Sequence, residues 1–282
     1  MLALDSPVWA QLSTAYGSAE EVPQQLALLA QQYNQQQAEE LYEELLHQDT
    51  LYTATLAAVP HLLSIAARFE DTSAMMSIYI DCGMIAAEYE IDQNPRIDSH
   101  LDPSLYHDIE QAYCQAVQNM NLLHDRILPI LSGPTIDPLE KQYVLAAWMA
   151  YHGYQNVARL LFHYPEGEEY PAICPHCSKE WYIWPPDEHN QQTSWIVYPD
   201  DPVTSDNKYG RMIQPNRDSN TADPECTDLE RIDPELAELS VRAGEFGLMD
   251  LQQRIPYLAG EVICPHCQEK GNVWKGILEH CI

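Results

Sequence analysis

The chain has 282 residues, of which 45% are hydrophobic, so it is long enough to bury one large core or two ordinary ones, which argues against global disorder. Its 43 acidic and 14 basic residues give a formal net charge of −29, which disfavours binding to nucleic acid and suits a basic partner protein. High solubility explains the same charge equally well. No apolar run approaches the roughly 18 residues of a membrane span, and no secretory signal is visible at the start, so we expect a cytoplasmic protein.

Residues 1–165 are predicted to form a mainly α-helical domain. Apolar side chains recur at helical spacing through this region, and Pro, Asn and Asp residues separate the successive helices. Residues 18–21 have the Ser-x-x-Glu form of a capping box ahead of a helix that is expected to begin near Val22. No alternating segment bounded by turns interrupts the pattern, so no strands are expected here.

Three proline-containing segments suggest an internal repeat within this domain. Pro23 and Pro60 are 37 residues apart, and Pro129 follows 69 residues later, close to two units of the same size. Such a period fits paired-helix repeats of the HEAT class. Because proline is also common in the first turn of any helix, the three matches have a simpler explanation as well.

The opening of the chain contains a recognisable set of residues: Trp9, Ala15–Ala19, His47–Gln48, Tyr52–Thr55 and Ala58–Pro60. These resemble the N-terminal part of a group of bacterial HEAT-like helical repeat proteins, mostly of unassigned function. The resemblance covers about the first 70 residues. It implies a solenoid-like stack of helices and supplies no catalytic residues.

Residues 166–282 are predicted to form a zinc-ribbon β module, interrupted at about 185–258 by an acidic, partly helical insertion. Helices are expected within the insertion at 234–246 and 248–258. The module is recognised by two near copies of one pattern, in which two apolar residues precede Cys-Pro-His-Cys and aromatic and β-branched residues follow it. The cysteines of the two motifs are Cys174 and Cys177, and Cys264 and Cys267.

These four cysteines predict one structural zinc ion. Each tight Cys-Pro-x-Cys turn presents two thiolates, and two turns complete a tetrahedral shell that leaves no position for a catalytic water. The motifs are separated by 86 residues, where a plain ribbon has roughly 15 to 20, so the insertion leaves from one motif and returns at the other. The sequence leaves open whether the two pairs bind one zinc within a chain or between chains.

A thiol–disulfide redox protein is an alternative, because Cys-Pro-His-Cys is also the active motif of periplasmic thiol oxidants of the thioredoxin class. In those proteins the motif opens a helix after a strand. Here residues 181–184 and 272–274 predict strands after both motifs, which favours zinc. His176 and His266 are expected to point away from the metal. The remaining cysteines lack ligand spacing: Cys82, Cys114, Cys226 and Cys281.

A metal-dependent phosphohydrolase is a second alternative. His107-Asp108 and His124-Asp125 resemble the His-Asp dyads of such enzymes, which need further ligands to converge on one site. The candidates for these further ligands are His61, His100 and Asp137. Exposed helix faces and helix caps explain the same residues without catalysis. The sequence has no nucleophile elbow, phosphate-binding glycine loop or His-Glu-x-x-His motif, so no catalytic residues are predicted.

The sequence therefore predicts a non-enzymatic, zinc-containing protein that binds a basic protein through its acidic surface. One specific form of this hypothesis is an immunity protein that neutralises a bacterial toxin. Aromatic residues are enriched at protein interfaces, and those of the insertion are candidate anchors, although they could instead cover the zinc module. These residues are Trp184, Trp195, Tyr198 and Tyr209.

Overall fold

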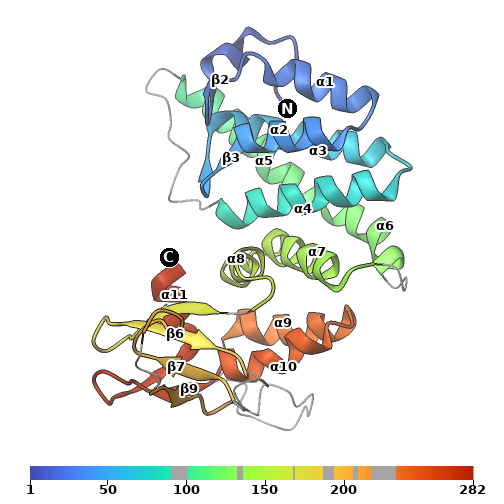
Figure 1. Ribbon diagram of the computed structural model, residues 1–282. Helices are drawn as coiled ribbons and strands as arrows, with labels where there is room; N and C mark the ends of the chain where they lie inside the picture. The colour runs from blue at the N-terminus through green and yellow to red at the C-terminus, as the bar shows by residue number, and fades with distance from the viewer. Residues whose placement is uncertain are drawn as a thin grey trace. The chain divides into compact units, whose positions relative to one another are not determined.

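The computed structural model describes residues 1–89, 101–131, 136–167, 169–186, 194–205, 209–216 and 233–281. The described chain is mainly α-helical with small antiparallel sheets, which confirms the predicted fold class at this level (Figure 1). It divides into two compact units, unit 1 (Met1–Phe162) and unit 2 (His163–Ile282). None of the described helices is long and apolar enough to cross a membrane.

Unit 1 consists largely of helices whose starts follow ordinary capping chemistry. Asp71, Asp102 and Asp137 each precede a helix, and each carboxylate accepts a hydrogen bond from the backbone N–H two residues later. A short 3₁₀ turn, Pro7–Gln11, comes first. The helices are α1 (Val22–Gln31), α2 (Gln35–Leu45), α3 (Thr53–Arg68), α4 (Thr72–Glu88), α5 (Pro103–Asn119), α6 (Asn121–Leu131), α7 (Pro138–Tyr151) and α8 (Gln155–His163).

Two short hairpins interrupt these helices, so the prediction of an uninterrupted helical region is wrong in this detail. They pair β1 (Ser13–Thr14) with β2 (Gly17–Ser18) and β3 (Leu46–His47) with β4 (Thr50–Leu51). The predicted capping box is wrong as well. The Ser18 hydroxyl donates to the carbonyl of Ala10 because Ser18 belongs to β2, and α1 begins without a side-chain cap.

The three prolines that suggested a repeat do not occupy equivalent positions. Pro23 lies in the first turn of α1, Pro60 is buried within α3, and Pro129 lies near the end of α6. Proline in a first turn replaces an N–H that has no helical partner, whereas proline in an interior removes a helical hydrogen bond. No helical repeat is apparent among the described residues of unit 1.

Unit 2 contains the predicted helices of the insertion, as α9 (Pro234–Glu245) and α10 (Met249–Leu258). The insertion also supplies strands that were not predicted, β7 (Ile196–Tyr198) and β8 (Arg211–Met212). These extend the hairpin of β5 (Tyr170–Ile173) and β6 (Glu180–Trp184) into an antiparallel sheet of order β5-β6-β7-β8.

A second hairpin of unit 2 pairs β9 (Glu261–Ile263) with β10 (Lys270–Asn272). The predicted strand over residues 272–274 is wrong after Asn272, because α11 (Val273–Cys281) begins there. The Asn272 side-chain oxygen accepts the backbone N–H of Lys275, which is helix-capping geometry. An isolated bridge between Gln214 and Glu261 joins the end of β8 to β9.

Helix α4 of unit 1 carries a half-buried acid, Asp81. Its neighbour Ser77 accepts a hydrogen bond from the Tyr33 hydroxyl at 2.9 Å and lies beside the Asp81 carboxyl. Burial raises the pKa of Asp81 to about 7, and the Glu39 carboxylate on α2 adds to the rise. Ionised Asp81 therefore works against the folded state.

We expect the Asp81→Asn substitution to raise the melting temperature of the protein at pH 8. Because the pKa of this acid is raised in the folded state, the folded protein binds more protons than the unfolded one between about pH 4 and 7, and the contribution of Asp81 to stability falls as pH rises through that window. The gain should shrink as pH approaches 4. Thermal unfolding followed by circular dichroism from pH 4 to 8 measures it, with exposed Asp108→Asn on α5 as the control; a gain that did not depend on pH would contradict the assignment.

Candidate metal centre

The structure brings the four cysteines of the two motifs together. Their sulfur atoms all lie within 4.8 Å of one another. Two sulfur–sulfur contacts join the motifs: Cys174 to Cys267 and Cys177 to Cys264, each with 3.9 Å between sulfurs. A tetrahedron with metal–sulfur bonds of about 2.3 Å has sulfur–sulfur edges of about 3.8 Å. The donor set and its dimensions fit one tetrahedral ion held within a single chain.

The two motifs adopt the same backbone geometry. Each lies in the turn of a hairpin, between β5 and β6 or between β9 and β10. In the first turn the Cys174 N–H donates to the Lys179 carbonyl, and in the second the Cys264 N–H donates to the Glu269 carbonyl, both at 2.8 Å. Ser178 and Gln268 occupy the same place in the two turns, with φ of 55° and 65°.

Trp181 links the two halves of the centre, a role that the sequence did not reveal. Its indole N–H donates to the Cys264 sulfur at 3.4 Å, although Trp181 follows the first motif and Cys264 belongs to the second. The ring is almost fully buried and packs on Gly271 and Gly276. A Cβ at Gly271 would lie 2.7 Å from the ring, so only glycine fits there. The feature of the sequence that could have indicated this role was the aromatic residue in the strand that follows the first motif.

The electrostatics of the centre favour thiolate at Cys264. Burial alone would raise the pKa of this thiol, but the N–H groups of Cys267, Trp181 and His266 point at the sulfur and lower the pKa to about 6. Burial raises the pKa of Cys174, which shares the cluster. Thiols crowded in this way resist simultaneous ionisation, and a bound divalent cation would favour the thiolate form of all of them.

The other cysteines and the motif histidines lie outside this cluster. Cys82 is buried and Cys114 is exposed in unit 1, and neither belongs to the four-sulfur group. Cys226 and the side chain of Cys281 lie outside the described residues. His176 and His266 are exposed on their turns, and the His176 ring donates to the Lys270 carbonyl at 3.0 Å.

Among the described residues, those suggested for a phosphohydrolase site form no cluster of possible metal ligands. His61 is buried and bonds the Leu2 carbonyl, whereas exposed His107 lies beside Gln111 on α5. The His124 ring lies near Tyr79 and Trp148. Asp137 caps α7. His100 lies outside the described residues.

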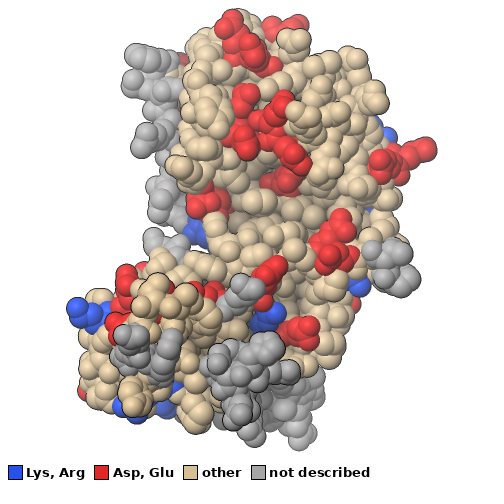
Figure 2. All heavy atoms as spheres, in the orientation of Figure 1, with Lys and Arg blue, Asp and Glu red and all other residues tan. Residues whose placement is uncertain are grey.

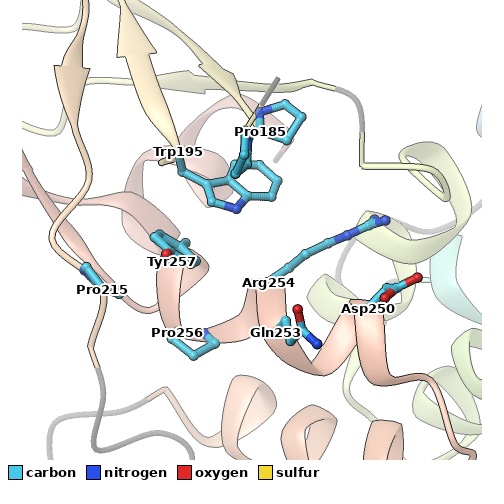
Figure 3. Close-up of a pocket in the computed structure, with 9 residues that line it drawn as sticks. Pro185, Trp195, Pro215, Asp250, Gln253, Arg254, Pro256 and Tyr257 are labelled. Carbon is cyan, nitrogen blue, oxygen red and sulfur yellow. The ribbon is translucent and has the colours of Figure 1, made fainter. Parts of the chain in front are cut away.

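A hollow of about 670 Å³ also lies in unit 2, bounded by α10 and the chain around β7 (Figure 3). Trp195 at its edge is 4% exposed, stacks on Tyr170 at 5.7 Å between ring centroids and lies near Tyr257, so this candidate anchor belongs to the core. The remaining lining residues bring prolines together with two charged side chains: Pro185, Pro186, Pro215, Pro256, Asp250, Gln253 and Arg254.

Comparison with known proteins assigns no family to the chain. No family model matches it, and neither the curated proteins nor the solved structures contain a match. The resemblance of the opening segment to HEAT-like proteins therefore stays a hypothesis.

We expect the Trp181→Phe substitution to weaken the binding of a divalent metal by about tenfold, because it keeps a ring against the glycines and removes the N–H donor to the Cys264 sulfur. Competition with a chromophoric chelator measures the affinity. Trp184→Phe, on the same strand and the opposite face of the sheet, is the matched control and should leave the affinity unchanged. Equal losses in both variants would show that Trp181 acts only through packing.

Proposed function

We propose that the protein is a non-enzymatic protein-binding protein in which one structural zinc ion, held by Cys174, Cys177, Cys264 and Cys267, stabilises unit 2. The observation that carries the zinc part of this proposal is the convergence of four sulfurs within 4.8 Å. All four candidate ligands are soft donors, as tetrahedral structural zinc prefers. Four protein ligands leave no coordination position open, so the ion would hold structure and would not activate water.

The position of both motifs in hairpin turns supports zinc over thiol–disulfide exchange. In the thioredoxin class the motif opens a helix, whose N-terminus stabilises the reactive thiolate. Here a strand follows each motif, and a hydrogen-bond donor for the Cys264 sulfur comes from Trp181 of the other hairpin. The two motifs therefore form one cluster of four sulfurs, whereas a redox site needs only one pair.

The binding part of the proposal is supported by charge. The formal net charge of −29 is large, and acidic side chains gather over the helices of unit 1 (Figure 2). Helix α2 contributes the exposed residues Glu39, Glu40 and Glu43. A field of this sign accelerates the approach of a basic protein and repels nucleic acid. An immunity protein that neutralises a basic toxin is one specific form of this function, and a HEAT-like origin of unit 1 is part of the same hypothesis.

The metal part is tested by the zinc content of protein purified without added metal. We expect one zinc per chain, lost in both Cys174→Ser and Cys264→Ser and retained in the control Cys114→Ser, whose thiol is outside the cluster. Acidification should release the ion, because zinc needs deprotonated thiols. Loss of zinc from only one of the two motif variants, or a metal-free wild type, would overturn the shared site.

The binding part is tested with a fluorescent decapeptide of alternating Lys and Arg, followed by anisotropy. Wild-type protein should bind it, and the affinity should fall about tenfold or more between 50 and 200 mM salt, because the attraction is screened. A decapeptide of Glu is the control and should not bind. Equal binding of both peptides, or of neither, would exclude a basic partner as the reason for the acidic surface.

A further inference from the structure

The sheet of unit 2 has two faces of different character. Strand pairing places Ala172 opposite Trp181 on one face, where Tyr170, Ile183 and Val197 also lie, and all five side chains are buried. This inner face includes the tryptophan that donates to the Cys264 sulfur. Because side chains alternate along a strand, the intervening residues of β6, β7 and β8 lie on the opposite, outer face.

The outer face carries large apolar side chains that are not fully buried. Trp184 pairs with Ile196, which pairs with Met212, so these three form a row across β6, β7 and β8. Trp184 and Ile196 are half-buried, and Met212 is 60% exposed. Tyr182 lies on the same face, two residues before Trp184, and is half-buried too. Apolar surface of this kind on a protein commonly marks a contact site.

Three carboxylates surround the aromatic part of this face. The Tyr182 hydroxyl donates to Glu180 at 3.0 Å, and Glu180, Asp201 and Glu169 all raise the pKa of Tyr182. The charged groups that act on this ring are therefore all negative. The pKa of Glu169 is itself raised, first by burial and then by the Asp201 carboxylate, while the neighbouring Trp184 side chain opposes the rise. Glu169 and Asp201 therefore act on each other as like charges beside the Tyr182 ring.

Aromatic rings beside carboxylates are the chemistry that recognises Lys and Arg. A cation over a Trp or Tyr face gains about 0.5–2 kcal/mol from the ring, and neighbouring carboxylates add charge-assisted hydrogen bonds. The aliphatic stem of a Lys or Arg side chain covers apolar surface at the same time. A basic partner would neutralise the negative charge of Glu169, Glu180 and Asp201, which a neutral apolar partner would not, so the charges favour a basic one.

We propose that the outer face of this sheet, formed by Tyr182, Trp184, Ile196 and Met212 and bordered by Glu169, Glu180 and Asp201, is the docking surface for a basic segment of a partner protein. Lys or Arg side chains lie over Tyr182 and Trp184, and their stems run along Ile196 and Met212. This inference rests on the proposed function and locates its contact in the zinc-binding unit.

The test compares two variants of the full chain with the same change in net charge. Glu169→Gln/Glu180→Gln removes two charges from the outer face, and Glu20→Gln/Glu21→Gln removes two from the exposed turn before α1 of unit 1. The probe is the Lys-Arg decapeptide, measured by anisotropy at 50 mM salt. The outer-face variant should bind about tenfold more weakly than the wild type, and the Glu20→Gln/Glu21→Gln variant within about twofold of it. Tyr182→Leu should lose about fivefold through the ring.

The other possible binding results distinguish failure of the docking surface from failure of the proposed function. Equal losses in the two charge variants would mean that binding follows net charge, which overturns the docking surface and leaves the proposed function standing. Absence of binding by the wild type would overturn both. Hydrogen exchange on the wild type gives a second measurement that needs no variant: the peptide should protect the amides of β6 and β7, and protection confined to unit 1 would overturn the surface.

Discussion

The structure of unit 2 depends on the meeting of four sulfur atoms from segments 86 residues apart in the sequence. The second hairpin has strands of only three residues, too short to be stable alone. The two hairpins meet through the sulfurs and through Trp181, whose ring lies on Gly271 and Gly276. The intervening chain is then constrained at both ends, which lowers the entropy that it would have as an open loop.

Strand β6 shows how one short segment contributes both to the four-cysteine cluster and to the outer face of the sheet. Its alternation directs Trp181 inward to the Cys264 sulfur and Tyr182 and Trp184 outward beside the carboxylates. A shift of register by one residue would exchange the two sets, removing the hydrogen-bond donor from the centre and the rings from the outer face at once. The fixed hydrogen bonds of the cysteine turn prevent such a shift, so the centre also sets the outer face.

The sequence predicted the cysteine cluster and the helices at 234–246 and 248–258 because their signals are local: ligand spacing in one case, apolar periodicity in the other. The predictions from sequence were wrong, or missed a role, where contacts between distant segments determine the local structure. Strands β7 and β8 are short and gain their stability from pairing, β7 with β6 and β8 with β7, which is not visible along the chain. Ser18 resembled a helix cap but belongs to a hairpin, and Val273 resembled a strand residue but follows a capping Asn272. The role of Trp181 required knowing which two hairpins meet.

Within each cysteine turn the two sulfurs differ in their access to solvent. Cys174 and Cys264, the first of each motif, are buried, whereas Cys177 and Cys267 are half-buried. An oxidant or alkylating agent arriving from solvent therefore meets one sulfur of each hairpin before it reaches the inner pair. Cys177 and Cys267 belong to different hairpins, so each of the two hairpins exposes one of its two sulfurs to chemical damage.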